Sequence, residues 1–374
     1  MMDAHVHLSK RNFHEYWCDA AADGFMSITQ LKKKIERMKM NKELQKASLK
    51  ATGQKQFHVH LHKPGVDGLS ALPKEWRDEV VPKDRPDPRA QKCWEVLDDF
   101  MTSFKDTGRF CSDHSPAFAN TMEAVVKPFW RHVIGMYAQA LASPKALAQV
   151  RSLLSQLSEL YETAYDGIFL TQVQDGDADA FDIYQQEVVK IMEPINTTHI
   201  SQPTTDIEEL YDSAHALYPQ YTHICADIAD ETGGQFTPAP IKHVYRAIEK
   251  TALRPDEIHR FECTNVYDVV RGALVYDTIS EVLVGLKEVC KRFTVIRIKN
   301  RFVPVGKASL SGGWRDVVVN MRIKGDRSQH VLEVQIQMRS LLKVRRSLGG
   351  HFIYAKYRAI SEALEVCGKL SMLE

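Results

Sequence analysis

Three short runs in the C-terminal half of the chain alternate between apolar and polar residues. They extend over Phe293 to Phe302, Trp314 to Lys324 and His330 to Met338. Successive side chains of a β-strand point to opposite faces, so each run predicts a strand with one apolar and one charged face. In the first run the charged set is Arg297, Lys299 and Arg301, and the other set is Thr294, Ile296 and Ile298.

Helical patterns flank these strands along the chain. Residues 279–292 and 341–364 have the spacing of amphipathic helices, and apolar residues recur at helical spacing from Trp94 to Tyr165. A sheet with one apolar face needs helices to cover that face. We therefore expect an α+β protein, in which a mostly helical N-terminal region precedes a domain with a small mixed sheet flanked by helices.

Prolines and glycines along the chain predict a division into three parts. Residues 1–91 form an N-terminal segment with histidine-rich strands and a linker, because five prolines fall between positions 63 and 91. Residues 92–210 form the helical region. Residues 211–374 form the sheet-bearing domain, which begins with a helix that the pair Gly233-Gly234 ends.

Composition narrows the classes of partner. The 374 residues hold 49 basic and 48 acidic side chains, so any site for an anion must be local rather than a property of the whole surface. Seven scattered cysteines without a Cys-x-x-Cys pair indicate a reducing compartment. The chain lacks an 18-residue apolar run, so we expect a cytoplasmic protein that does not enter a membrane.

The charged face of the predicted sheet holds two acids among several bases. The acids are Asp268 and Glu333, and the bases include Arg322 as well as the three of the first strand. This mixture suits a phosphorylated ligand with a divalent metal: the bases neutralise phosphate, one carboxylate holds Mg²⁺, and the other accepts a proton from a hydroxyl group. A solvated face with ion pairs has the same pattern and remains an alternative.

Several motifs occur in a fixed order along this region. Lys242-His243-Val244-Tyr245 with Lys250 comes first, then the acidic Asp268, then Gly313-Trp314-Arg315-Asp316, then Glu333-Val334-Gln335-Ile336-Gln337, and finally a basic helix with His351, Tyr354 and Arg358. This order resembles the synthetase domain of RelA/SpoT-type alarmone synthetases. The resemblance extends over about residues 215–365.

The resemblance implies a nucleotidyltransferase-like fold and a reaction. The chain would transfer a pyrophosphoryl or nucleotidyl group from ATP to a hydroxyl group of GDP, GTP or another acceptor, with Mg²⁺ held by Asp268 and Glu333, which are also the implied catalytic residues. The nucleotide-binding positions that it implies, together with nearby bases, are Lys242, Tyr245, Arg246, Lys250, Arg271, Arg297, Lys299, Arg301, Trp314, Arg315, His351, Tyr354 and Arg358.

The chain also departs from the family pattern. Pro240, Ala273, Val318 and Gln337 replace two arginines, a histidine and a further arginine that the family uses around its nucleotides. These changes leave open a catalytically inactive module that binds a nucleotide or RNA. They also predict looser base selectivity in an active enzyme, because stacking on Trp314 tolerates any base whereas edge hydrogen bonds discriminate. An RNA 3′ end is therefore a candidate acceptor.

Two histidine clusters near the N-terminus support a weaker alternative. Asp3-Ala4-His5-Val6-His7 and His58-Val59-His60-Leu61-His62 have spacings that can bind zinc, which would fit a metal-dependent hydrolase. The other ligands of such an enzyme have no recognisable counterpart downstream. Histidine pairs are common on exposed strands, and this is the preferred explanation of the two clusters.

Overall fold

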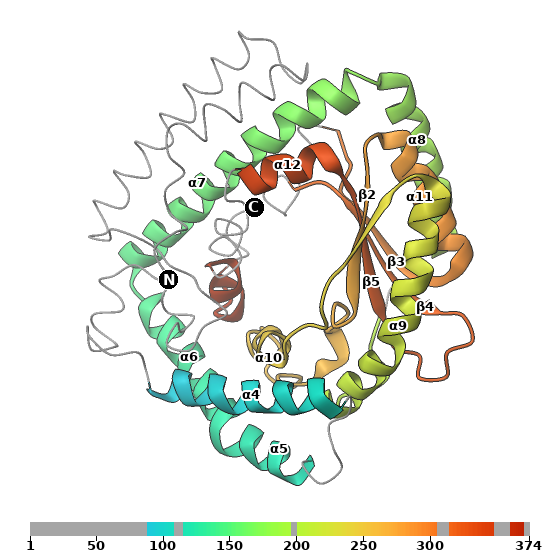
Figure 1. Ribbon diagram of the computed structural model, residues 1–374. Helices are drawn as coiled ribbons and strands as arrows, with labels where there is room; N and C mark the ends of the chain where they lie inside the picture. Colours follow the sequence, from blue (N-terminus) through green and yellow to red (C-terminus); the bar gives the residue numbers. More distant parts are fainter. Residues whose placement is uncertain (1–87, 108–114, 196–199, 305–313, 348–359, 370–374) are drawn as a thin grey trace.

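A single mixed sheet organises the part of the chain that the computed structural model describes, namely residues 88–107, 115–195, 200–304, 314–347 and 360–369 (Figure 1). Its five strands lie in the order β1-β2-β5-β4-β3. Only the central β2–β5 pair is parallel. The strands are β1 (Gln235–Pro238), β2 (Arg271–Tyr276), β3 (Phe293–Asn300), β4 (Val317–Ile323) and β5 (Leu332–Met338). The α+β prediction is confirmed.

Two helices cover one face of the sheet, α9 (Ile207–Thr232) and α11 (Ile279–Arg292) (Figure 1). The side chain of Asp206 caps the start of α9, and Gly233 ends it in the left-handed conformation at φ 71°. Thr278 and Glu281 form a capping box at the start of α11. These local signals fix both helices at the ends that the sequence predicts.

The opposite side of the sheet carries α10 (Val244–Ala252) and α12 (Arg339–Ser347), with a curved row of helices beyond them (Figure 1). α10 packs on α4 and α6, and α12 packs on α7. The row consists of α4 (Pro88–Thr107), α5 (Ser115–Thr121), the short π-helix η2 (Met122–Val126), α6 (Lys127–Ala140) and α7 (Pro144–Phe169). The chain continues through the short π-helix η3 (Leu170–Gln174) into α8 (Ala178–Met192), which packs on α11, and then into the short η4 (Glu193–Ile195). None of the described helices combines the length and hydropathy needed to cross a membrane.

Buried apolar side chains form one continuous cluster from Cys93 to Val366. The helical row therefore shares its core with the sheet. Ion pairs add to this contact, because Arg315, next to β4, reaches Asp166 on α7 at 2.7 Å. The three-part division at positions 91 and 210 stays a prediction.

Two features of the strands differ from the alternation pattern. β3 has a register shift between Val295 and Arg297, which puts Thr294 at the surface and buries Phe293. A bulge adds one residue to a strand and so changes which side chains share a face. The charged face is also less open than predicted, because Asp316 and Asn320 are fully buried. Within the predicted helix 341–364, the described segments are α12 up to Ser347 and helical residues 360–366.

Candidate active site

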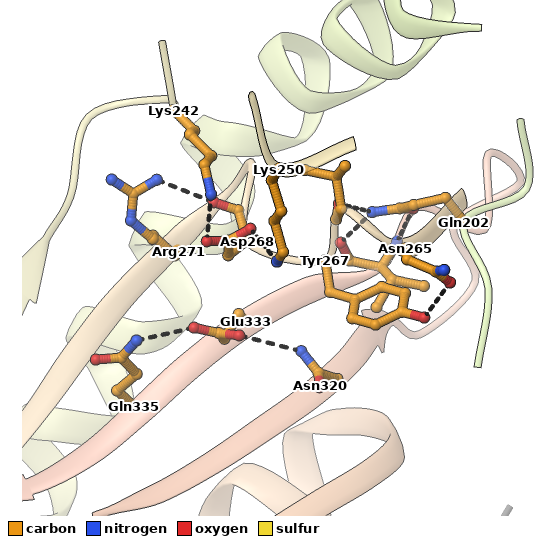
Figure 2. A network of polar contacts seen from close by, with 12 residues as sticks. Gln202, Lys242, Lys250, Asn265, Tyr267, Asp268, Arg271, Asn320, Glu333 and Gln335 are labelled. Carbon is orange, nitrogen blue, oxygen red and sulfur yellow. Dashed lines mark hydrogen bonds and ion pairs between the residues drawn. The ribbon is translucent and has the colours of Figure 1, made fainter. Parts of the chain in front are cut away.

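Asp268 lies in the loop that leads into β2, with cations on both of its carboxylate oxygens (Figure 2). Lys242 Nζ is 2.6 Å from Oδ2, and Lys250 Nζ is 3.1 Å from Oδ1. Arg271 Nη1 donates to the backbone carbonyl of the same residue at 2.9 Å. Lys250 belongs to α10 and Lys242 lies two residues ahead of its first residue, Val244, so this helix and the segment just before it supply the two ammonium groups.

The charges in this cluster shift its pKa values strongly. Burial alone would raise the pKa of Asp268, but the ammonium groups of Lys250 and Lys242 outweigh burial and hold that pKa well below its usual range. Burial lowers the pKa of Lys242 to about 8 although Asp268 opposes the shift. For Lys250 the nearby Asp268 and Glu333 overcome burial and raise the pKa. Asp268 is therefore ionised throughout the physiological range.

Glu333 is the second carboxylate of the cluster and lies on β5, in register with Arg271 of β2. Gln335 Nε2 donates to Oε1 at 2.8 Å, and Asn320 Nδ2 approaches Oε2 at 3.5 Å (Figure 2). Burial, and then the charge of Asp268, raise the pKa of Glu333. Two neighbouring carboxyl groups with opposite pKa shifts can take different roles, one as a fixed charge and one as a proton acceptor.

The fold brings these groups together at one end of the central strand pair. β2 and β5 are parallel, so Asp268, just before β2, and Glu333, near the start of β5, lie at the same end of the pair. The start of α10 is fixed next to them because Lys242 N donates to Val269 O at 3.0 Å and Tyr211 donates to Lys242 O at 2.5 Å. Lys242 and Lys250 thus lie against Asp268.

A cavity of about 470 Å³ lies close to the two carboxylates without being lined by either. Two of its lining residues connect it to them: Arg271 bonds the backbone carbonyl of Asp268, and Gln335 bonds the carboxylate of Glu333. Among the described residues, the lining includes basic and amide side chains and no acidic one. The lining residues are Gln235, Thr237, Pro238, Ala239, Arg271, Gly272, Ala273, Val275, Gln335, Gln337, Arg339, Leu342, Lys343 and Arg345. Such a lining suits an anionic ligand with hydrogen-bonding groups, such as a nucleotide polyphosphate.

The two carboxylates fit a magnesium ion that arrives with its ligand. Mg²⁺ is usually held by one or two carboxylates together with water and substrate phosphates, rather than by a complete protein cage. The donor set agrees with this, because the described residues contain no group of three or more histidine, cysteine, aspartate or glutamate side chains placed to hold a metal. Asp268 and Glu333 would supply the protein's share of the ligands.

Three predicted bases, two on β3 and Arg301 just after it, lie on the other flank of Glu333. Arg297 donates to Asn320 Oδ1, and its guanidinium group lies 5.1 Å from the centre of the Tyr267 ring. Arg301 pairs with Asp316 at 2.6 Å. Burial, followed by the charges of Arg301 and Arg297, lowers the pKa of Lys299. An anion near Lys299 would relieve this repulsion between cations.

Three residues predicted to bind a nucleotide instead make contacts within the protein. Tyr245 is 4 % exposed and packs on the Trp130 ring, which anchors α10 to the helical row. Arg246 forms an ion pair with Glu249 on the same helix. Arg315 is 2 % exposed, pairs with Asp166 and lies over the Phe169 ring. Tyr245 and Arg315 therefore contact the helical row, which the strand pattern alone does not reveal.

Trp314 is also buried in this structure, with 7 % of its surface exposed. Tyr165 contacts the ring at a centroid distance of 5.2 Å, and the Arg345 guanidinium lies 4.6 Å from the ring centre. Its indole N–H donates to Asp316 at 2.8 Å. The ring is therefore not an open stacking surface for a base, and a base would have to displace Arg345 to reach it.

The remaining predicted residues, His351, Tyr354 and Arg358, lie outside the described residues, as do the histidine clusters at 3–7 and 58–62. Conversely, the sequence reasoning missed the part of the cavity that β1 and α12 supply. The missed residues with charged or polar side chains are Gln235, Thr237, Arg339, Lys343 and Arg345. The sequence does contain a signal for the last three. A strand of alternating apolar and polar residues leads directly into a helix that carries basic residues at helical spacing.

Among known proteins, the chain is similar only in part to solved structures, and nineteen chains of such structures match it. No family model matches the chain, and no curated protein does. The chain is 19 % identical to the type VI effector Tas1, solved in complex with its immunity protein, over 43 % of this chain and 77 % of that one, at a TM-score of 0.30. It is 17 % identical to small alarmone synthetase 1 from Bacillus subtilis bound to its product pppGpp, over 44 % and 92 % of the two chains, at a TM-score of 0.28. Likenesses this low say nothing about the function of this chain.

Proposed function

We propose that this protein transfers a pyrophosphoryl or nucleotidyl group from ATP to a hydroxyl group of an acceptor nucleotide. One observation carries the proposal: Asp268, paired with Lys242 and Lys250, and Glu333, bonded by Gln335, lie close to a cavity that Arg271 and Gln335 help to line with cations and amides. Transfer of a phosphoryl-type group depends on charge neutralisation and positioning rather than on covalent chemistry by the protein. The site supplies both.

The donor ATP fits the cavity between β1, β2, β5 and α12. Arg271, Arg339, Lys343 and Arg345 line it and provide positive charge for a triphosphate. Lys242 and Lys250, which pair with Asp268, would exchange this carboxylate for phosphate oxygens when ATP binds. The exchange costs little electrostatic energy because each ammonium group trades one anion for another.

That exchange leaves Asp268 with an ionised carboxylate for Mg²⁺, and Glu333 would complete the protein's ligands. A bound Mg²⁺ neutralises charge that develops on the transferred phosphates. The low pKa of Asp268 suits this role, because a metal ligand must stay deprotonated.

Glu333 is the candidate general base for the acceptor hydroxyl. Its raised pKa makes it a better proton acceptor than an ordinary carboxylate. In the pyrophosphoryl version of the reaction, the hydroxyl oxygen forms a bond to the β-phosphorus, the bond between the α,β-bridging oxygen and that phosphorus breaks, AMP leaves, and Glu333 takes the hydroxyl proton. The nucleotidyl version attacks the α-phosphorus and releases pyrophosphate.

The proposal puts the two substrates on opposite flanks of Glu333, and the strand order supports this arrangement. The cavity lies over β1, β2 and β5, whereas Arg297 and Lys299 lie on β3 at the far edge of the sheet. Glu333 on β5 is between them. An acceptor with phosphates of its own, such as GDP or GTP, would find its cations at Arg297 and Lys299. An RNA 3′ end stays a weaker candidate, because Trp314, the proposed stacking ring, is buried.

A nucleotide-binding module without catalysis is the second candidate. The pairing of both Asp268 oxygens with lysines favours it, because these ammonium groups occupy the place of a metal. Such a module would bind nucleotides equally well without Mg²⁺.

The test is turnover with ATP, Mg²⁺ and a panel of acceptors that includes GDP, GTP and a short RNA. We expect product from the wild type and a loss of at least about a hundredfold in Asp268→Asn, the size typical for removal of a charge that stabilises a transition state. Asp256→Asn removes an exposed acid that pairs with His259 and serves as the control. Equal behaviour of the wild type and Asp268→Asn with every acceptor would reject catalysis, and Mg²⁺-independent binding would then establish the module.

A further inference from the structure

The buried carboxamide of Gln202 connects the two chain segments that lead to the candidate acids. It belongs to the extended segment before α9, and only 3 % of the residue is exposed. Its Nε2 donates to the carbonyls of Val266 and Val331, both at 2.9 Å. Its Oε1 accepts from the N–H of Val331 at 2.9 Å. Val266 lies just ahead of Asp268 on the chain, and Val331 lies just ahead of Glu333.

These hydrogen bonds lie just outside the β2–β5 ladder, where the sheet does not fix the positions of the two segments. The parallel β2–β5 pairing begins at Arg271 and Glu333, and the N–H of Glu333 donates to Val270 O at 3.0 Å. Asp268 is upstream of the first pair, so the ladder does not set its distance from Glu333. The Gln202 side chain bonds the two segments beyond the end of the ladder. Figure 2 shows this side chain beside Asn265 and Tyr267, on the loop that carries Asp268.

The backbone around Gln202 holds the carboxamide in place. Its own N–H donates to Thr264 O at 2.7 Å. The hydroxyl of Tyr267, next to Asp268, donates to Ile200 O at 2.7 Å. The segment of residues 200–206 is thus bonded along the loop that carries Asp268, and its one inward amide reaches across to the strand that carries Glu333.

We propose that Gln202 is a positioning residue, which fixes the separation between Asp268 and Glu333 and so aligns the metal-binding acid with the proton acceptor. The inference rests on the proposed function, in which both acids act on one substrate pair. A primary amide suits this place, because it offers two donors and an acceptor that match two carbonyls and one N–H. Glutamate lacks the donors, and methionine lacks all three bonds.

The test compares Gln202→Met with the wild type in two measurements. Steady-state kinetics should show kcat reduced about 10- to 100-fold, the effect of a displacement near 1 Å in a reacting group. The KM for ATP should change less than about threefold, because the cations of the cavity are untouched. Separately, ¹³C NMR titration of the Glu333 carboxyl group should show a changed pKa, because its distance from the Asp268 charge changes.

Tyr276→Phe is the matched control. It removes a buried hydroxyl that bonds Thr232 at 2.7 Å at the far end of β2. We expect it to lower thermal stability while kcat and the Glu333 titration stay as in the wild type. If Gln202→Met does not fold, Gln202→Glu replaces it in both measurements, because the glutamate keeps the acceptor for the Val331 N–H.

Each outcome decides the inference. An unchanged Glu333 pKa in a folded Gln202 variant would overturn it, whatever the activity. So would failure of both Gln202 variants to fold beside a folded Tyr276→Phe, because Gln202 would then have only a structural role. The last outcome is a wild type that turns over no acceptor while the Glu333 pKa still shifts in a Gln202 variant. That result would reject the proposed function and leave the positioning role in place.

Discussion

Lys242 and Glu333 set the limits of the pH range in which the site has its working charges. The raised pKa of Glu333 means that the proton acceptor is lost as the pH falls through that value. The pKa of Lys242 is about 8, so this phosphate-binding charge is lost as the pH rises past it. We therefore expect a bell-shaped dependence of kcat/KM on pH, with the alkaline limb near 8.

Lys242→Arg provides the check on that assignment. A guanidinium group stays charged at every accessible pH, so the alkaline limb should move upward in the variant. An alkaline limb that stays in place would show that another group causes it.

His330 gives a second residue-level prediction, on stability rather than on turnover. It is fully buried ahead of β5, its Nδ1 lies 2.8 Å from Ser213 Oγ, and burial lowers its pKa to about 4 against the pull of Asp326. The folded protein therefore resists protonation of His330 more than the unfolded chain does. Stability from this residue is complete above the unfolded pKa of roughly 6.5 and is lost as the pH falls toward the folded value.

The expected loss between pH 6.5 and 4 is roughly 3 kcal/mol of unfolding free energy, from the size of the pKa shift. Urea unfolding of the wild type and of His330→Gln at several pH values measures it. The difference between the two proteins should shrink as the pH falls. A constant difference would contradict the assignment.

At the scale of elements, the contact between α11 and the sheet depends on a small residue. A methyl group on Gly285 would come within 2.3 Å of the Tyr276 hydroxyl and within 2.6 Å of its ring. Gly285→Ala should therefore lower the unfolding free energy by about 1–3 kcal/mol, as overpacking does. Gly135, in α6, is the control, because its added methyl group meets nothing within 4 Å.

Thermal unfolding of the two variants tests this packing. Gly135→Ala should raise stability by up to about 1 kcal/mol, since alanine is the better helix former. A Gly285→Ala variant that gains as much as Gly135→Ala would show that α11 does not press on Tyr276 as described.

Elements with local signals were predictable from the sequence, and those set by distant contacts were not. The capping box Thr278–Glu281 and the apolar period place α11 at 279–292, as found. β1 has no such signal: it is four residues long and forms only by pairing with β2. The bulge in β3 likewise depends on its pairing with β4. Both outcomes follow from tertiary contacts that no short window of sequence contains.

The same distinction applies to the site. The isolated acids Asp268 and Glu333 stand out in the strand pattern, and the structure brings them together with the predicted Lys242 and Lys250. Trp314 stands out equally, yet it is buried because α7, far away in the sequence, supplies Tyr165 against its ring. Sequence reasoning finds residue types that suit a reaction but does not show which of them the helical row covers.

At the scale of the whole molecule, nearly balanced charge makes the cationic cavity a local feature. Lys343 lines it on the exposed side of α12. We expect Lys343→Gln to weaken ATP binding by about tenfold at low salt and by less at high salt, because the contact is screened. Lys291→Gln, which removes an exposed lysine on α11, is the control. Isothermal titration with ATP at two salt concentrations measures both, and an equal effect of the two variants would argue against donor binding in the cavity.

The most direct test of the central claim follows both ends of the ATP molecule in one reaction. ATP labelled separately in the adenine ring and in the γ-phosphate is incubated with Mg²⁺, wild-type protein and a GDP or GTP acceptor. Pyrophosphoryl transfer predicts AMP and γ-labelled acceptor in equal amounts, whereas nucleotidyl transfer predicts adenine-labelled acceptor and free pyrophosphate. Both signals should disappear in Asp268→Asn and in Glu333→Gln. Label that stays in ATP with every acceptor, or label transfer that survives in both variants, would contradict the account.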